Sequence, residues 1–241
     1  MCGRYAASTR PDQLIEIFEV DQADAAGFAD WDRPRWNIAP TDRVPAVLER
    51  TAAGGRIRRL AGLRWGLIPG WSRTTAGAAR MINARFETVA RRPAFRRAFA
   101  ARRCLLPADG YYEWYPTQLA GRSYKQPFYI HLVSGIMAMA GIYEFWRDPT
   151  ASGGRGNWLA SCAILTATAT DEFGRLHDRM PVQVAPQNWA AWLDPELTDP
   201  VAAAALASVP EPGQMLAHAV STRVNRVGND GPELVTPLPT G

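Results

Sequence analysis

Six short stretches typical of β-strands follow one another between residues 104 and 184, with no helical pattern among them. Strands that do not alternate with helices argue against an array of parallel βαβ units. We therefore expect an α+β fold: a single domain on a curved, mostly antiparallel β-sheet or open barrel, with peripheral helices. The six stretches are 104–107, 110–115, 128–133, 137–146, 158–168 and 181–184.

Helices are expected mainly outside this region. Ser8 or Thr9 can cap a helix over residues 8–20, and Pro11 suits its first turn. No internal repeat or long linker interrupts the chain, so one domain should cover residues 1–235, with a tail at 236–241. The other expected elements are helices at 86–89, 93–100, 186–193 and 200–208, strands at 43–50, 56–66 and 215–221, and a surface loop at 67–80.

Composition is that of a water-soluble enzyme. Hydrophobic residues make up 47% of the chain and charged residues 21%, which excludes wholesale disorder. No apolar run approaches the ~18 residues that a membrane span needs, and the N-terminus shows no signal peptide. A cytoplasmic location is expected.

Cysteine and histidine usage argues against disulfides and metals. Cys104 and Cys162 lie in apolar strand-like runs and are expected in the core. Three cysteines with no CxxC spacing do not suggest a disulfide framework. The three histidines are equally scattered, and the common nucleotide-cofactor motifs are missing. We expect neither a metal nor a cofactor.

Positive charge is concentrated in one stretch. The net charge is +4, and Lys125 is the only lysine. Residues 80–103 contain eight arginines and a single acid, Glu87. Arginine binds phosphate through two parallel hydrogen bonds, so the stretch suits nucleic-acid contacts. A solvated helix face is the alternative interpretation.

The first residues, MCGRYA, carry a reactive possibility. A small second residue permits removal of Met1, which would leave Cys2 at the terminus. An α-amine and a thiol on one residue form a 1,2-aminothiol, a group that reacts readily with aldehydes. The alternative is that Cys2 is simply a small residue behind methionine.

Six further motifs, taken together with MCGRY, resemble the SRAP family, the SOS response-associated peptidases that process abasic sites. The resemblance covers residues 2–235 and implies the SRAP fold. The motifs are WNIAPT at 36–41, RWGLIPGW at 64–71, MINARFET at 81–88, RRCLLPADGYYEWY at 102–115, RLHDRMPV at 175–182 and STRVNRV at 221–227.

The resemblance implies an abasic-site sensor that acts on single-stranded DNA. Such a protein forms a covalent DNA–protein crosslink, a thiazolidine made by the amine and thiol of Cys2 once Met1 is gone, and shields the lesion. Met1 leaves by self-cleavage or by an aminopeptidase, hence the peptidase classification, and a weak lyase activity is implied too. The expected partner is single-stranded DNA with abasic sites, and the protein should be a monomer, nucleoid-associated when bound to DNA.

Four residues are expected to carry the chemistry. Beside Cys2, Glu113 is the general acid/base, and its aromatic surroundings should raise its pKa if the carboxylate points inward. His177 can exchange a proton near neutral pH. The resemblance assigns Asn83 to the opened sugar. Glu113 on a strand surface and a merely structural His177 are the alternatives.

The resemblance also supplies a set of DNA contacts. Trp71, on a Gly/Pro-rich loop, should stack on bases, although a core tryptophan is nearly as plausible. Ser72 and Phe86 depart from the residues common in the family. The DNA-binding set is Arg4, Asn37, Pro40, Trp71, Asn83, Arg85, Thr166 and Arg179.

Two other functions compete with this one. An N-terminal-nucleophile amidohydrolase or peptidase would use Cys2 to attack an amide, but gives no reason for the arginine stretch. A non-covalent single-strand-binding module would use the arginines and tryptophans and be indifferent to Cys2.

Overall fold

A closed ring of five strands forms the centre of the molecule. The computed structural model describes residues 2–24, 33–119, 121–151, 158–169, 176–211 and 213–239. The ring closes because β11 pairs with both β10 and β5, so the barrel is closed rather than open. Its strands, in ring order, are β11 (Trp158–Thr168), β5 (Gly55–Trp65), β4 (Arg43–Ala52), β7 (Arg103–Ala108) and β10 (Met137–Arg147).

Most strand pairs are antiparallel, as expected, but β11 pairs in parallel with two elements. One is β5, and the other is the short strand β6 (Asn83–Arg85). Short strands extend the sheet beyond the ring: β2 (Gln22–Ala23), β12 (Arg179–Pro181), β13 (Gln183–Val184) and β14 (Ala207–Ser208).

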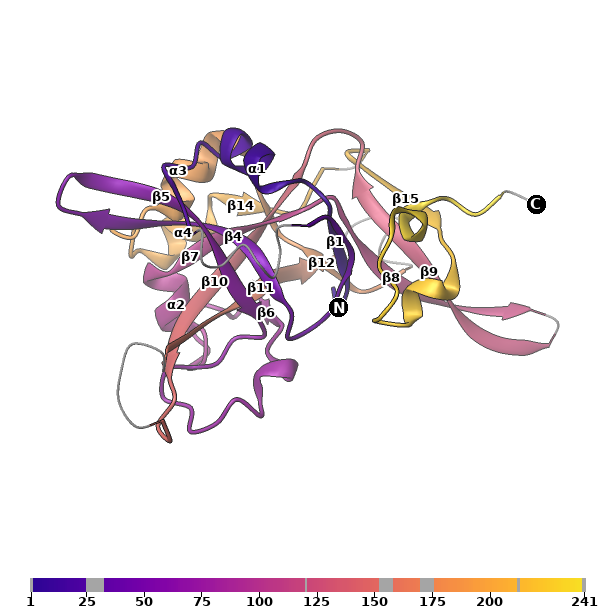
Figure 1. Cartoon of the computed structure of the whole chain (residues 1–241), viewed down its shortest axis with the longest axis horizontal. Helices are drawn as coiled ribbons and strands as arrows, with labels where there is room; N and C mark the ends of the chain where they lie inside the picture. Colours follow the sequence, from indigo (N-terminus) through magenta and orange to yellow (C-terminus); the bar gives the residue numbers. More distant parts are fainter. Residues whose placement is uncertain are drawn as a thin grey trace.

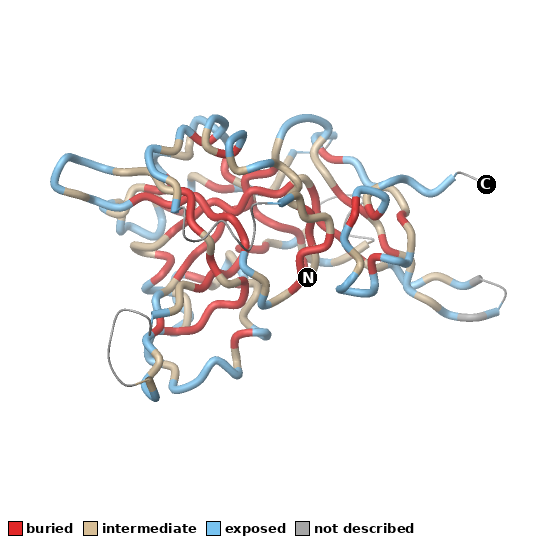
Figure 2. The backbone as a smooth tube through the Cα atoms, viewed as in Figure 1, coloured by how far each residue is buried: buried red, intermediate tan, exposed pale blue. Residues whose placement is uncertain are grey.

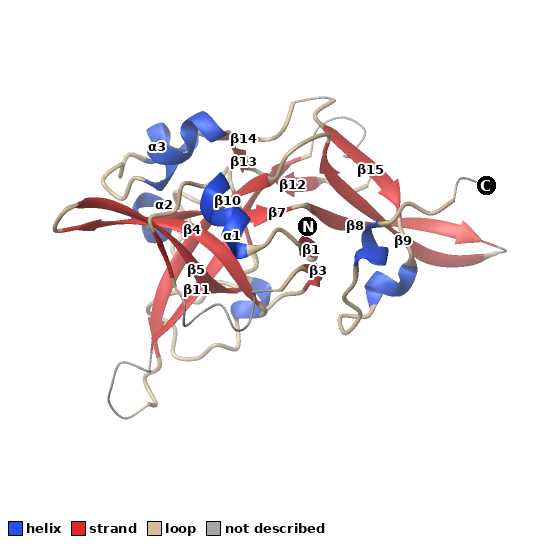
Figure 3. Ribbon diagram, turned by 45° about the horizontal axis from the view of Figure 1, so that its top comes forward, coloured by secondary structure: helices blue, strands red, loops and turns tan. Residues whose placement is uncertain are grey.

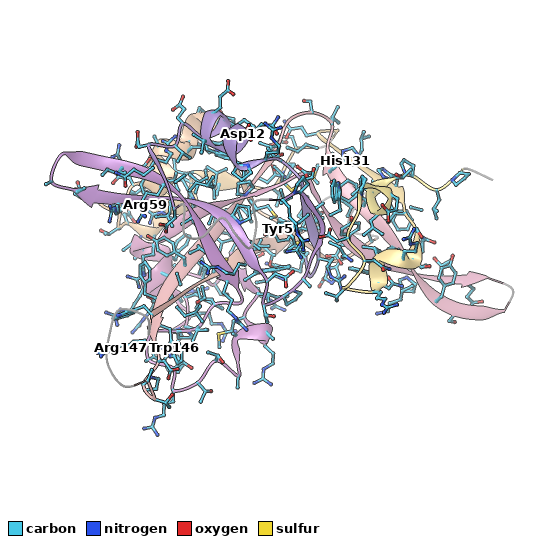
Figure 4. The ribbon with its side chains drawn as sticks, in the orientation of Figure 1. Tyr5, Asp12, Arg59, His131, Trp146 and Arg147 are labelled. Carbon is cyan, nitrogen blue, oxygen red and sulfur yellow. The ribbon has the colours of Figure 1, made fainter. Side chains whose placement is uncertain are left out.

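A second, five-stranded sheet lies beside the barrel (Figure 1). Its strand order is β15 (Met215–Ala219), β9 (Arg122–Leu132), β8 (Gly110–Leu119), β1 (Tyr5–Ala7) and β3 (Arg35–Ile38). The N-terminal strand β1 therefore runs between the long β8–β9 hairpin and β3, and Figure 4 shows its Tyr5 near the middle of the molecule.

The helices are short and peripheral (Figure 3). They are α1 (Pro11–Ile17), α2 (Arg96–Ala101), α3 (Trp189–Leu193) and α4 (Pro200–Ala204), and the 3₁₀ turns are η2 (Ala78–Arg80), η5 (Pro186–Asn188), η6 (Thr222–Asn225) and η7 (Pro232–Val235). No helix in the described part of the chain is long and apolar enough to cross a membrane.

Side chains on the barrel strands pack alternately into two hydrophobic clusters. One packs against the helices, with Phe99 of α2 and Trp192 of α3 among its largest members. The other joins the barrel to the second sheet and contains Cys104, Cys162 and Tyr5. Both cysteines are core residues, as expected. The buried backbone in Figure 2 accordingly concentrates along the strands at the centre.

Several expected elements were wrong in extent. Residues 86–91 form turns rather than a helix, and the helix expected at 93–100 begins only at Arg96. The helix expected over 8–20 covers only 11–17, and the one expected over 200–208 ends at Ala204 and is followed by β14. The arginines of 80–103 therefore do not share one helix face.

Candidate active site around Cys2

Backbone pairing brings the start of the chain against β8. Tyr5 is in register with Tyr111, and the Tyr112 N–H donates to the Arg4 carbonyl oxygen at 2.9 Å. Cys2 is fully buried within the cluster that contains Tyr111. Burial raises the pKa of the Cys2 thiol, and the negative charge of Glu113 raises it further. The thiol is therefore held in its protonated form beside a carboxyl group.

Glu113 points into the protein, which is the condition under which a raised pKa was expected. Its side chain is 4% exposed, and burial raises its pKa to about 7. Tyr111 lies two residues earlier on β8 and is also buried. Side chains two residues apart lie on the same face of a strand, so Tyr111 and Glu113 share one face of β8. That face is the one directed toward Cys2. A carboxyl group with this pKa can both give and take a proton at neutral pH.

Asn83 holds the backbone of Cys2. The parallel pairing of β6 with β11 places Asn83 opposite Ile164. Its Nδ2 donates to the carbonyl oxygen of Cys2 at 2.8 Å. Its Oδ1 is buried and accepts no hydrogen bond within the described residues. The amide thus fixes Cys2 and keeps one acceptor atom for a ligand.

His177 is neutral at physiological pH. Its Nδ1 lies 2.9 Å from the backbone N–H of Arg179, a contact that favours the tautomer with the proton on Nε2. Burial lowers the pKa of the imidazole. Nδ1 also lies 2.8 Å from Oδ1 of the exposed Asp178, a pair that becomes an ion pair only when the ring is protonated.

These segments enclose two adjoining cavities. The first, of about 250 Å³, is lined by Asn83, Arg85, Thr166, His177, Asp178 and Arg179. The second, of about 480 Å³, is lined by Trp71, Arg80, Met81, Asn83, Arg85, Thr88, Arg92, Pro93, Ala94 and Phe95. Asn83 and Arg85 belong to both linings, so the two cavities adjoin at these residues. Within the described ranges, no three His, Cys, Asp or Glu side chains gather in a way that could hold a metal ion.

Comparison with known proteins identifies the family of this chain. The model of the family described as SOS response associated peptidase (SRAP) matches residues 1–227. The chain belongs to the SRAP family.

Two bacterial relatives match this chain over nearly its whole length. The chain is 37% identical to the abasic site processing protein YoqW of Bacillus subtilis, covering 98% of this chain and 99% of the relative. It is 32% identical to the abasic site processing protein YedK of Escherichia coli, over 99% of this chain and 100% of the relative. A protein of known structure from Bacteroides thetaiotaomicron has the same fold, with a TM-score of 0.82, 22% identity, and coverage of 98% of this chain and all of that one.

Two of the expected DNA contacts lie open to solvent in this SRAP chain. Trp71 is 68% exposed, which rules out the core-tryptophan alternative, and Arg85 is exposed where the two cavities join. Ser72 and Phe86, the two residues that differ from those common in the family, line neither cavity. Phe86 packs on Phe99 with ring centroids 6.3 Å apart. The Ser72 carbonyl oxygen accepts a hydrogen bond from the Trp146 indole at 2.6 Å.

Arg4 and Asn37 lie behind the site rather than on its surface. Asn37 is fully buried, and its Nδ2 donates to three carbonyls, those of Val224, Arg226 and Asn229. Its Oδ1 accepts from Arg4 Nη1 at 2.7 Å. The STRVNRV segment is thereby tied to β1 and β3. Pro40 lies in the turn between β3 and β4 and does not line either of the two cavities.

Thr166 and Arg179 form the wall of the first cavity. Thr166 is 1% exposed, and its carbonyl oxygen accepts from Arg179 Nη2. Arg179 itself is held by Glu87.

The sequence reasoning did not assign individual roles to several cavity residues. Arg80 and Arg92 belong to the arginine stretch that composition indicated, and both are exposed at the second cavity. Phe95, which lines the same cavity, and Glu87 gave no such signal. Arg103, in the same stretch, is buried and donates to backbone carbonyls, among them that of Trp192 at 2.7 Å. Composition alone could not separate the internal arginine from the exposed ones.

Proposed function

We propose that this chain processes abasic sites in single-stranded DNA by bonding covalently to them through Cys2. The observation that carries the proposal is the convergence of Cys2, Glu113 and Asn83 beside a cavity lined by His177. The names of the relatives and the family membership support the same substrate. Residues 1–235 would carry the function, with 236–241 as a tail.

The proposed reaction begins at the amine of Cys2. Removal of Met1, a residue outside those described, frees this amine. An α-amine has a pKa of about 7.7–8.0, so part of it is unprotonated near neutral pH. It adds to the C1′ aldehyde of the opened abasic sugar, and the carbinolamine loses water to give an imine.

The thiol of Cys2 then closes the ring. Its sulfur bonds to the imine carbon while its proton passes to the imine nitrogen, giving a five-membered thiazolidine with no other leaving group. Well-oriented intramolecular steps reach effective molarities of up to about 10⁵–10⁸ M. Ring closure should therefore outpace β-elimination, which would break the strand, and any lyase activity should be weak.

Proton transfer falls to Glu113 and His177 in this scheme. The Glu113 carboxyl, with a pKa of about 7, can protonate the departing hydroxyl and take the thiol proton. His177, neutral with its proton on Nε2, can donate a hydrogen bond to a sugar oxygen in the first cavity. Asn83 would hold the Cys2 carbonyl and offer Oδ1 to a sugar hydroxyl.

DNA would follow the exposed arginines. Arg85 can clamp a phosphate next to the lesion, and Arg80 and Arg92 extend positive charge along the second cavity. Trp71 provides a flat surface for a neighbouring base.

The test is a denaturing gel of the protein incubated with single-stranded DNA that carries one abasic site. Intact mass should first show that Met1 is gone. A slow band is expected that needs the abasic site and is lost in Cys2→Ala. Absence of that band from protein with a free Cys2 amine would overturn the proposal.

The two competing functions predict other results. Catalytic hydrolysis of a chromogenic amide that depends on Cys2 would indicate an amidohydrolase or peptidase. Salt-sensitive binding that ignores both the abasic site and Cys2 would indicate a non-covalent binding module.

A further inference from the structure

Glu87 forms a two-point ion pair with Arg179, a residue that lines the first cavity. Its Oε1 accepts from Arg179 Nη1 at 2.7 Å, and its Oε2 accepts from Arg179 Nη2 at 2.9 Å. Its Oε1 also accepts the backbone N–H of Thr168 at 3.2 Å. One carboxylate thus ties the segment after β6 to the end of β11 and the start of β12. Paired donors of this kind fix orientation as well as distance.

We propose that Glu87 is a positioning residue that, through Arg179, sets the orientation of His177 against Asn83 and Arg85. The inference rests on the proposed function of this cavity and adds to it a residue that lies outside the reacting set.

The path from Glu87 to His177 is short. The Arg179 side chain is 11% exposed and held on three acceptors, because Nη2 also donates to the Thr166 carbonyl oxygen. Its backbone N–H is the donor to His177 Nδ1. The Arg179 side chain and the pairing of β12 with β11 thus act together on the peptide group that faces His177 Nδ1. A second-layer hydrogen bond commonly decides which imidazole nitrogen carries the proton.

The same carboxylate reaches the other wall. Glu87 follows Arg85 by two residues and Asn83 by four, and the Phe86 N–H donates to the Thr166 carbonyl oxygen at 2.9 Å. The opposed walls of the cavity thus meet at the Thr166 carbonyl. Loss of the pair should let the walls move relative to each other.

Glu87 also offsets charge near His177. The Arg179 hydrogen bonds lower the pKa of Glu87 to about 2, so it stays ionised at all working pH values. The charged groups of the cavity are Arg85, Arg179 and Asp178. Arg179 lowers the pKa of His177, whereas Asp178 raises it. Removing the Glu87 charge leaves Arg179 uncompensated and should lower the imidazole pKa further.

The experiment compares Glu87→Gln with Glu87→Asp, which keeps the charge. Asp12→Asn is the matched control, because Asp12 on α1 pairs with the exposed Arg10 just before the helix. ¹⁵N NMR of imidazole-labelled protein should show His177 as the Nε2–H tautomer in the wild type and in Asp12→Asn. Glu87→Gln should show mixed tautomers and a lower His177 pKa, and Glu87→Asp should recover most of the wild-type signal.

Crosslinking provides the second measurement. At saturating abasic DNA, Glu87→Gln should crosslink roughly tenfold to a hundredfold more slowly, the scale of a small misplacement of reacting groups. In a Cys2→Ala background it should bind undamaged single strands at least as tightly as its parent, because it gains one net positive charge.

Weaker DNA binding with an unchanged His177 spectrum would show that the pair serves DNA contact or stability and would overturn the inference. If the wild type formed no Cys2-dependent crosslink, the proposed function would fail, and the NMR comparison would still decide the role of Glu87.

Discussion

At the scale of single residues, the feature on which the proposed chemistry depends is the burial of Glu113 near Cys2. A carboxyl group in water titrates near 4.5, whereas this one titrates at about 7 because the protein has removed its hydration. The shift has a cost in stability at high pH. Below about pH 4.5 the Glu113 carboxyl is protonated in both the folded and the unfolded chain, so its ionisation does not affect stability. As the pH rises from about 4.5 to about 7, the unfolded chain loses this proton more readily than the folded one, and the free energy of unfolding falls.

Glu113→Gln should therefore stabilise the protein at alkaline pH. At pH 8 we expect the variant to gain about 2–3 kcal/mol over the wild type in urea unfolding, shrinking to a small difference at pH 5. The variant should also crosslink about 10²–10⁴-fold more slowly, because glutamine carries no exchangeable acid proton. An equal gain in stability at both pH values would contradict the assigned titration.

At the scale of elements, the loop after β5 that carries Trp71 is anchored by contacts with β10. Trp146 is buried near the end of β10, where Figure 4 labels it. Its indole packs with Ile68 and Ala78 and donates to the Ser72 carbonyl. These contacts anchor the loop to the barrel, so the Trp71 side chain can stay exposed to solvent.

Trp71→Ala should weaken binding to single-stranded DNA by about 1–3 kcal/mol, the contribution of one stacked base. The melting temperature should not change, because the side chain is 68% exposed. Trp158→Ala is the matched control, since Trp158 on β11 is 57% exposed and outside both cavities. Fluorescence anisotropy with a labelled oligonucleotide measures both variants. Equal losses would mean that the effect is not specific to the loop.

At the scale of the whole molecule, closure of the barrel depends on small residues where strands approach. Gly141 of β10 is in register with Cys104 of β7. A Cβ at this position would lie 2.9 Å from both Cys104 Sγ and Leu106 Cδ1. Real Cβ atoms do not tolerate such distances, so the buried side chains of Cys104 and Leu106 would have to shift.

Gly141→Ala should lower the free energy of unfolding by about 1–3 kcal/mol through overpacking. Gly54→Ala serves as the reference, because a Cβ there meets nothing within 4 Å. Urea denaturation of both variants gives the comparison. A Gly141→Ala variant as stable as Gly54→Ala would mean that the ring has room to spare.

Local patterns in the sequence were enough to predict much of the fold. Alternating apolar residues located the long strands, and their succession without helices predicted the α+β class. Helix ends and the turns at 86–91 were missed, because short helices are decided by packing rather than by local preference. For the site, Cys2, Glu113, Asn83 and His177 were all named from sequence motifs, and the structure gathers them.

What the sequence determined by itself is therefore the inventory of reactive groups and the strand order along the chain, since both depend on residues close together. The closed ring, the fully buried Asn37 and the Glu87–Arg179 pair were decided by the tertiary structure. Glu87 and Arg179 are 92 residues apart. No local period reports such a contact, because only the pairing of β11 with β6 and β12 brings the two side chains together.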